Sequence, residues 1–314
     1  MTAGPEASTG TASSGAEPAP APPGPPVVLT IAGSDSGAGA GIQADLKAVA
    51  ALGGFAVTAV TAVTAQNTKT VAAVHPVPAG MVTAQIEAVL ADMPVAATKT
   101  GMLATAETIE VVTRLATSGR LPALVVDPVL VASSGRPLLD GAGIHAVRRL
   151  TGRALVATPN LWEAALLAGV DVESLVDVDA MVEAGRRIHG FGARWVLVKG
   201  GHLPGVGPES GTAPARVPDV LVGEGGVRVL EASHVATANV HGTGCSLSAA
   251  IATGLARRAA GGADPASVVP DAVDDAKRYV HRALVGGAGW RLGAGRGPLD
   301  HLGHLWAGTE PPPG

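Results

Sequence analysis

The residues best suited to chemistry lie at positions 241–245, where Gly242 and Gly244 flank Thr243 and a cysteine follows. A run of small apolar residues without any acidic side chain comes next, and it predicts a helix. The N-terminus of a helix carries about half a positive charge and several unpaired N–H groups. Because nothing in the first turn neutralises them, the pattern predicts a site for an anion such as phosphate. The alternative is a plain glycine turn that enters a core helix.

The only cysteine of the chain, Cys245, lies in this first turn. A free thiol has a pKa of about 8.5, and a helix N-terminus lowers that value. We therefore expect the pKa of Cys245 to be lowered, so that its thiolate can act as a base. The alternative is a buried thiol with no chemical role.

Further polar side chains occur where short apolar segments stop. Lys199 and Gln66 each follow one such segment, and Asn160 and Glu163 follow a third. Together with the anion turn, a cation, an acid and amides are the parts that phosphoryl transfer requires. Structural explanations remain open as well. Asn160 would cap a helix with Glu163 as its capping-box partner, Lys199 would be a solvated strand end, and the amide would close a turn.

These side chains need a scaffold that brings the ends of strands together. Residues 27–31 form an apolar, β-branched run that predicts a buried strand, residues 33–41 form a glycine-rich loop, and helical spacing begins at Ile42. The loop fits neither the dinucleotide-binding fingerprint nor the Walker A pattern. The alternation then repeats, with strands at 55–63, 96–99, 124–129, 154–157 and 195–198 and helices at 79–93, 243–256 and 266–285. This order predicts an α/β fold with a mostly parallel sheet, whose carboxyl ends form the ligand crevice.

The segment between His202 and Val227 is rich in glycine and proline and contains a short apolar run at 218–222. We predict a flap on a short hairpin that covers a nucleotide. An ordinary surface loop is the alternative.

Composition narrows the class of protein. The 314 residues include 22 Lys and Arg and 26 Asp and Glu, so the net charge of −4 argues against a nucleic-acid partner. No apolar run predicts a membrane span. The single cysteine excludes an intrachain disulfide and favours a reducing compartment, the cytoplasm. Residues 1–26, rich in Ala, Pro and Gly, are expected to be a disordered tail, and 306–314 a loose C-terminal tail.

A set of short motifs occurs in order along the chain, namely Ala32-Gly33-Ser34-Asp35, the octapeptide 40–47, Ala65-Gln66-Asn67-Thr68, Lys99-Thr100-Gly101-Met102-Leu103, Thr158-Pro159-Asn160, Lys199-Gly200-Gly201-His202 and His241-Gly242-Thr243-Gly244-Cys245. This ordered set closely resembles the bacterial hydroxymethylpyrimidine and phosphomethylpyrimidine kinases of thiamine biosynthesis, in the ribokinase superfamily. The resemblance covers about residues 27–305, which are expected to form one ribokinase-like kinase domain.

The resemblance implies a three-layer α/β fold with helices on both faces of a mostly parallel sheet and a small flap. It also implies ATP and Mg²⁺, a small pyrimidine substrate and a homodimer. The implied reaction is phosphorylation of 4-amino-5-hydroxymethyl-2-methylpyrimidine to its monophosphate and then to its diphosphate.

Roles for single residues follow from the same resemblance. Gln66 is expected to pair with the aminopyrimidine edge, and the other expected pocket residues are Gly33, Asp45, Met102 and Val129. The expected nucleotide and phosphate group comprises Lys199, Asn160, Glu163 and His241. Within it, Glu163 also holds Mg²⁺ through water. The expected catalytic residues are Gly242, Thr243, Gly244 and Cys245, with the N–H groups as an anion hole and the cysteine as the base.

Three other functions stay open from the sequence. A pyridoxal or pyridoxine kinase of the same superfamily would share the ATP chemistry but bind a pyridine. A hydrolase would use Cys245 and His241 without ATP. A regulatory protein would bind the pyrimidine on a kinase scaffold without turnover. For single residues, structural alternatives also remain open, since Met102 and Val129 could be core residues and His241 a surface histidine.

Overall fold

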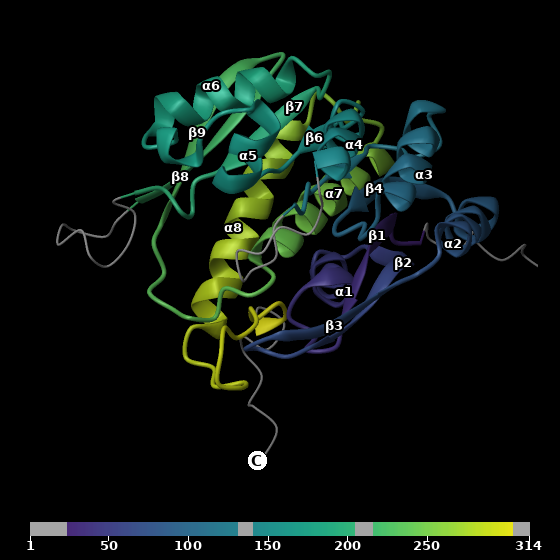
Figure 1. Cartoon of the computed structure of the whole chain (residues 1–314), viewed down its shortest axis with the longest axis horizontal. Helices are drawn as coiled ribbons and strands as arrows, with labels where there is room; N and C mark the ends of the chain where they lie inside the picture. Colours follow the sequence, from purple (N-terminus) through teal and green to yellow (C-terminus); the bar gives the residue numbers. More distant parts are fainter. Residues whose placement is uncertain (1–23, 131–140, 205–215, 304–314) are drawn as a thin grey trace, which may run out of the picture.

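The computed structural model describes residues 24–130, 141–204 and 216–303 (Figure 1). The tail predicted at 306–314 lies outside these residues, as does the predicted N-terminal tail apart from residues 24–26. Residues 205–215 of the predicted flap also lie outside. The domain limits 27–305 therefore stay a prediction.

A sheet of nine strands forms the middle of the molecule, in the order β3-β2-β1-β4-β5-β6-β7-β8-β9. The strands from β2 to β7 in this order are parallel, whereas β3 at one edge and β8 and β9 at the other run antiparallel to their neighbours. The strands are β1 (Val27–Asp35), β2 (Phe55–Gln66), β3 (Val71–Pro76), β4 (Val95–Thr100), β5 (Val125–Val126), β6 (Val156–Ala157), β7 (Trp195–Lys199), β8 (Arg216–Gly223) and β9 (Gly226–Ser233).

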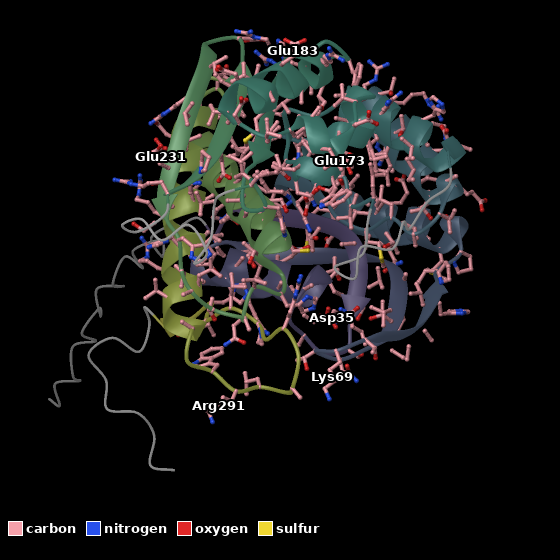
Figure 2. All side chains as sticks on the ribbon, turned by 60° about the vertical axis from the view of Figure 1, so that its left-hand side comes forward. Asp35, Lys69, Glu173, Glu183, Glu231 and Arg291 are labelled. Atoms are coloured by element: carbon pink, nitrogen blue, oxygen red, sulfur yellow. The ribbon has the colours of Figure 1, made fainter. Side chains whose placement is uncertain are left out.

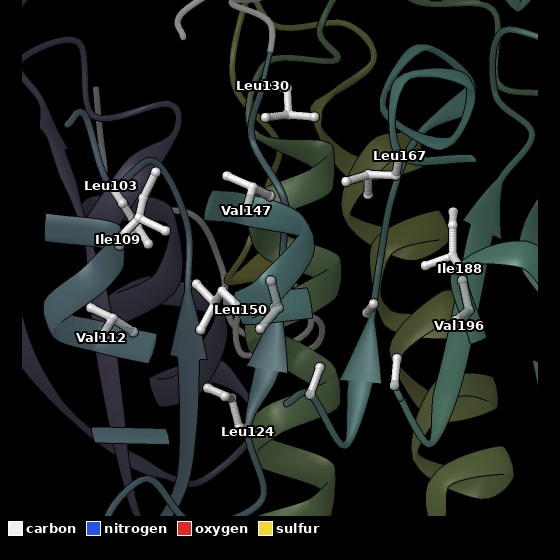
Figure 3. Close-up of a cluster of buried hydrophobic side chains, with 14 of the residues drawn as sticks. Leu103, Ile109, Val112, Leu124, Leu130, Val147, Leu150, Leu167, Ile188 and Val196 are labelled. Atoms are coloured by element: carbon white, nitrogen blue, oxygen red, sulfur yellow. The ribbon is translucent and has the colours of Figure 1, made fainter. Parts of the chain in front are cut away.

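Helices cover both faces of this sheet, so the predicted three-layer α/β fold is confirmed (Figure 1). Their bounds are α1 (Gly41–Ala51), α2 (Ala79–Asp92), α3 (Ala106–Thr117), α4 (Gly141–Thr151), α5 (Leu161–Ala168), α6 (Val178–His189), α7 (Thr243–Ala260) and α8 (Val269–Gly287), with a short 3₁₀ helix at Val172–Ser174. One apolar core lies under α2 to α6, and Figure 3 shows its centre around Leu124 and Leu150. A second core packs α1, α7 and α8 on the opposite face. No helix of the described residues is long and apolar enough to cross a membrane.

The strand order reverses between β1 and β4. The chain moves outward from β1 to β2, then returns to the other side of β1 for β4 and continues from there. Such a reversal opens a crevice at the carboxyl ends of the two strands, where open α/β sheets bind ligands. Gly33 lies near the end of β1, and Gly101 and Met102 directly follow β4. The fold therefore places two predicted pocket residues, Gly33 and Met102, at this crevice.

The flap prediction is wrong for residues 218–222. They belong to β8, which pairs with β7 on one side and β9 on the other, and Val220 and Leu221 have no exposed surface. The apolar run is explained by burial on both faces of a strand within the sheet. The hairpin itself, formed by β8 and β9, is confirmed.

The helices differ in how their N-termini are satisfied. Thr105, Asn160 and Asp177 each accept a hydrogen bond from the first turn of α3, α5 and α6. By contrast, the N-cap residue of α7 is Gly242, which has no side chain to cap the helix. The first turn of α7 contains no acidic residue, and basic residues occupy its last turn. The anion-site pattern predicted for this helix is therefore present in the fold.

Candidate active site

The start of α7 packs directly against the glycine-rich loop that leads into α1. Gly242 has φ +85°, in the left-handed region, and a side chain at this position would collide with the carbonyl oxygen of Gly39. A side chain on Gly39 would in turn collide with the His241 ring. The N-termini of α1 and α7 are thereby held together, and the Gly41 N–H donates to the Cys245 thiol.

An ion pair faces the first turn of α7. Lys199, at the end of β7, places its Nζ 3.0 Å from Oδ1 of Asp127, which directly follows β5. A Cβ on Gly244 would lie 3.3 Å from that Nζ and 3.7 Å from Asp127 Oδ2. Thr158 and Ser248 hydroxyls also donate to the Asp127 carboxylate, at 3.2 and 3.4 Å. An ammonium and a carboxylate thus lie beside the first turn of α7, where the Thr243 N–H donates to the Val240 carbonyl oxygen at 3.3 Å.

Asn160 and Glu163 form the capping box of α5. Asn160 Oδ1 accepts from the Glu163 N–H at 3.0 Å, and Glu163 Oε2 accepts from the Asn160 N–H at 2.8 Å. The backbone of Asn160 also forms an isolated parallel β-bridge with Lys199 at the end of β7. The structural explanation is confirmed, and the same contacts bring both residues next to the Lys199 and Asp127 pair.

Burial strongly affects the acid in this cap. Glu163 is only 3% exposed. Burial raises its pKa to about 7; Lys199 opposes this increase, whereas Asp127 adds to it. Burial also disfavours the Lys199 ammonium, but the Asp127 and Glu163 carboxylates outweigh that effect and raise the pKa of Lys199. Lys199 therefore stays charged beside an acid that takes up a proton near neutral pH.

The expectation of a lowered pKa for Cys245 is wrong in this structure. Burial raises the pKa of the thiol to about 11, although Lys99 and the Gly41 N–H both act to lower it. Asp45 and Asp127 contribute in the same direction as burial. Desolvation and nearby carboxylates therefore outweigh the Lys99 ammonium and the Gly41 N–H, and the sequence argument considered none of these groups.

A buried ion pair lies beneath the crevice. Lys99 on β4 and Asp45 on α1 have no exposed side-chain surface, and Lys99 Nζ lies 2.9 and 2.8 Å from the two carboxylate oxygens. Thr30 on the neighbouring β1 donates to the same carboxylate at 2.5 Å. Burial disfavours the Lys99 ammonium, but the Asp45 carboxylate outweighs it, so the pKa of Lys99 is raised.

The expected pocket role of Asp45 stays a prediction. In the ligand-free chain its side chain has no exposed surface. Its carboxylate neutralises Lys99, whose Nζ lies 2.8 Å from the position that a Cβ on Gly101 would occupy. The Lys99–Asp45 ion pair thus lies at the carboxyl end of β4 and joins that strand to α1.

A second polar group surrounds the loop after β1. Asp35 accepts backbone N–H groups from Gly37, Gly39 and Ala40 at 2.8, 3.1 and 2.9 Å. His241 Nε2 lies 2.9 Å from the same carboxylate. Burial opposes ionisation of Asp35, but the His241 hydrogen bond and the backbone N–H groups together lower its pKa. Figure 2 shows Asp35 at the same end of the molecule as Lys69 and Arg291.

Gln66 joins this group from the end of β2. Its Nε2 lies 3.2 Å from His241 Nε2, and its Oε1 lies 3.3 Å from Thr64 Oγ1. His241, expected among phosphate ligands, thus contacts Gln66 and Asp35 directly. It connects the predicted pyrimidine-recognising amide to the anion turn that it precedes.

The other predicted pocket residues occupy two places. A side chain on Gly33 would collide with Met102 Cε, so these two residues are direct neighbours. Val129 lines a cavity of about 10 Å³ with Gly101 and Leu103, beside α3 and α4. That volume is roughly the space of one water, so this cavity is too small for a ring-sized ligand.

The described residues contain no group of three or more His, Cys, Asp or Glu side chains placed to hold a metal ion. The buried carboxylates of Asp127 and Glu163 are the nearest candidates, since both lie beside Lys199. Mg²⁺ commonly takes one or two carboxylates together with substrate phosphates and water. These two acids fit that pattern.

Sequence reasoning missed two charged residues of the site. Asp127 ends an apolar run like Lys199 does, but we assigned it no role from the sequence. Lys99 ends another such run, in a central parallel strand that must be buried on both faces. Asp45 could have been predicted as the partner of Lys99, because it lies with Ile42 and Val49 on the buried side of α1.

Comparisons with known proteins found one matching family and several similar chains. The model of one protein family, phosphomethylpyrimidine kinase, matches residues 35–300. The chain is similar to a hydroxymethylpyrimidine/phosphomethylpyrimidine kinase of Streptomyces coelicolor, with 45% identity over 272 residues, covering 86% of this chain and 92% of that protein.

Two further similarities show how far the relationship extends. The thiamine biosynthesis bifunctional protein ThiED of Geobacter sulfurreducens is 42% identical over 273 residues, which cover 87% of this chain and 51% of that protein. The chain thus spans about half the length of this relative. Among solved structures, an ADP complex of Bacillus subtilis pyridoxal kinase has a TM-score of 0.76 at 34% identity, covering 89% of this chain and 99% of that chain.

The first prediction concerns the charge of Glu163. Its pKa rises from 4.5 to about 7 on folding. Between these pH values the unfolded chain is ionised while the folded chain keeps the proton, so wild-type stability falls as pH rises. Glu163→Gln keeps an oxygen for the capping box but cannot ionise. We expect the wild type to lose up to about 3 kcal/mol of unfolding free energy relative to this variant between pH 4.5 and 8.

Urea unfolding of both proteins at several pH values measures this difference, and titrating groups distant from Glu163 cancel because both chains carry them. A difference that stays constant with pH, or that favours the wild type as pH rises, contradicts the raised pKa.

The second prediction concerns the Cys245 thiol, with a pKa of about 11. Only the thiolate reacts with iodoacetamide, so labelling of the folded protein should increase about tenfold per pH unit from pH 7 to 9.5 without a plateau. A free thiol, with a pKa of about 8.5, levels off within this range. Because the chain has one cysteine, mass spectrometry of the intact protein follows this residue alone, and Cys245→Ser is the unlabelled control. A plateau by pH 8 would restore the lowered pKa.

The third prediction tests the ion pair beneath the crevice. Lys99→Met leaves the Asp45 carboxylate unpaired without solvent, which costs about 3–5 kcal/mol of unfolding free energy. Adding Asp45→Asn removes the charge and keeps an oxygen for Thr30. We expect the double variant to recover at least half of the loss in urea unfolding. If the double variant is less stable than Lys99→Met alone, unpaired charge is not the cause.

Proposed function

Because this chain belongs to the phosphomethylpyrimidine kinase family, we propose that it phosphorylates 4-amino-5-hydroxymethyl-2-methylpyrimidine with ATP, first to the monophosphate and then to the diphosphate. The family is one of phosphotransferases, which sets the class of reaction. The step from this class to the substrate is our proposal, and its setting is thiamine diphosphate biosynthesis.

One observation carries the proposal. The Lys199 and Asp127 pair, 3.0 Å apart, lies against Gly244 in the uncapped first turn of α7, while His241, just before that turn, contacts Gln66. A phosphate-binding group and a ring-recognising amide thus converge on one end of α7. Transfer of a phosphoryl group between two bound substrates requires such convergence.

In this proposal the two substrates meet at the start of α7. The pyrimidine ring lies in the crevice of β1 and β4, with Gln66 on its amino edge and Met102 beside Gly33. The hydroxymethyl oxygen attacks the γ-phosphorus of ATP in line. The N–H groups of Gly242 and Gly244 and the Lys199 ammonium stabilise the charge on the transferring group. The Thr243 N–H joins them when the phosphate replaces its long bond to the Val240 carbonyl oxygen, at 3.3 Å.

Asp127 and Glu163 would hold Mg²⁺, directly or through water, with Asn160 beside them. Bound Mg²⁺ neutralises charge on the nucleotide phosphates. The chain's own contribution would be to keep both carboxylates buried beside the Lys199 ammonium, where they could hold a cation close to the nucleotide phosphates. A nearby dication also favours the ionised form of Glu163, whose pKa of about 7 leaves it partly protonated in the ligand-free protein.

Cys245 enters the proposal as a positioning group. With a pKa of about 11, only about one thiol in ten thousand is ionised at pH 7, which makes a thiolate base ineffective in the ligand-free protein. Phosphoryl transfer through a loose transition state depends chiefly on positioning and charge stabilisation. The thiol therefore serves as a neutral neighbour of the attacking oxygen, held by the Gly41 N–H.

Pyridoxal kinase is the second candidate function, because a pyridoxal kinase is among the similar solved structures. The family match and the higher identity to the pyrimidine kinase of S. coelicolor favour the pyrimidine. A cytoplasmic location, where ATP is plentiful, and a homodimer complete the proposal. The hydrolase and regulatory alternatives do not account for the family match as well as phosphotransfer does.

The fourth prediction is the activity itself. Incubation of the full chain with hydroxymethylpyrimidine, ATP and Mg²⁺ should release ADP and give products carrying one and then two added phosphates by mass. Pyridoxal under the same conditions should give a kcat/KM at least tenfold lower. As a matched control, Lys199→Gln should reduce kcat by about 10²–10³, the effect of removing one charge-stabilising donor.

Different outcomes would reject different parts of the proposal. A higher kcat/KM for pyridoxal would make the chain a pyridoxal kinase. ADP release without any phosphorylated pyrimidine would reject the substrate but not the ATP chemistry.

A further inference from the structure

The amide of Gln66 can present either its oxygen or its nitrogen to His241, since a half-turn about its last side-chain bond exchanges the two. The backbone at this residue is fixed, because the Ser36 hydroxyl donates to its carbonyl oxygen at 2.7 Å and accepts from its N–H at 2.8 Å. The amide itself lies between Thr64 and His241, so its orientation remains to be assigned. Hydrogen-bond accounting decides such choices.

The proton of His241 is placed by Asp35. The Asp35 carboxylate accepts three backbone N–H groups, and its pKa is lowered by the His241 bond and by these groups, so it is ionised. His241 Nε2 lies 2.9 Å from this carboxylate. An unprotonated Nε2 would bring two lone pairs together, whereas Nε2–H donates a hydrogen bond. Nε2 therefore carries the proton and cannot accept from Gln66.

The other side of the amide leads to the same orientation. Thr64 Oγ1 lies 3.0 Å from the Ser34 carbonyl oxygen, which can only accept. The single Thr64 hydroxyl proton is therefore used in that bond, and Oγ1 has only lone pairs for Gln66, at 3.3 Å. The position next to Thr64 therefore needs an N–H donor. Next to His241, at 3.2 Å, an amide oxygen can share the Nε2–H that donates to Asp35 in a three-centre hydrogen bond, whereas an amide N–H would find no lone pair there. Both needs are met when Oε1 faces His241 and Nε2 faces Thr64.

We propose that His241 is a positioning residue that, together with Asp35, fixes the Gln66 amide with its oxygen toward the anion turn and thereby determines which way round an aminopyrimidine ring binds. This inference rests on the proposed function. The amino group of the ring donates to Oε1, and the adjacent ring nitrogen accepts from Nε2. The C5 hydroxymethyl group is next to the amino group, whereas the C2 methyl group is next to the ring nitrogen. The reactive hydroxyl is consequently directed to the His241 side, where the turn begins.

The reverse amide orientation would turn the ring over. The ring nitrogen would then face His241, and the C2 substituent would point toward Gly242 in place of the hydroxymethyl group. A swapped isomer, 4-amino-2-hydroxymethyl-5-methylpyrimidine, carries its hydroxyl at that position. It should be a poor substrate for the wild type and a better one for any protein whose amide is free to rotate.

The fifth prediction compares two variants with these two isomers. His241→Phe keeps a ring against Gly39 but removes the N–H donor. His241→Gln retains a donor close to the position of Nε2. We expect the preference of the wild type for the natural isomer, as a ratio of kcat/KM values, to fall at least tenfold in His241→Phe and to be kept within about threefold in His241→Gln. A structural disturbance alone would lower both rates in proportion and leave the ratio unchanged.

Neutron diffraction of the ligand-free wild type, exchanged into deuterated water, tests the amide without any substrate. The expected result is the ND₂ group of Gln66 toward Thr64 and a deuteron on His241 Nε2. An ND₂ group toward His241, or an unchanged isomer ratio in His241→Phe, overturns the inference. If the wild type phosphorylates neither isomer, the proposed function fails and the ring-orientation inference fails with it, even where the diffraction result shows the expected amide.

Discussion

The site depends on one close contact, in which the backbone of Gly242 lies against the backbone of Gly39. This contact brings the N-termini of α1 and α7 together at the crevice between β1 and β4. Neither helix has an acidic residue in its first turn, so two positive helix ends are left facing one region. Two carboxylates lie near these positive helix ends. Asp127 forms an ion pair with Lys199, and Asp35 contacts the His241 ring.

Much of this arrangement could be predicted from the sequence, because strand ends in a parallel sheet must share one edge. Lys199, Asn160 and Glu163 each follow an apolar run, and all three lie together in the structure. The capping box of α5 followed from residue types and spacing alone. The uncapped start of α7 was equally visible, as glycines before an acid-free helix.

What the sequence could not provide is the balance of burial against charge. The helix-terminus argument for Cys245 did not include the groups around the thiol. Burial and the carboxylates of Asp45 and Asp127 raise its pKa, and no local sequence pattern reveals that environment. Likewise, the sequence placed Asp45 in a motif but did not indicate a charged partner for it. Only the three-dimensional structure shows that Lys99 forms an ion pair with its carboxylate. The run at 218–222 misled for a similar reason, since a buried strand and a covering flap can share one apolar pattern.

The ion pair of Lys99 and Asp45 also affects how the protein responds to heat. Keeping two ions away from water costs less as temperature rises, because the hydration of charged groups weakens on warming. The stabilisation from apolar burial levels off over the same range. The core of this chain is mainly alanine, valine and leucine. The contribution of the Lys99–Asp45 ion pair to the free energy of unfolding should therefore weaken less on warming than the contribution of the apolar core around it.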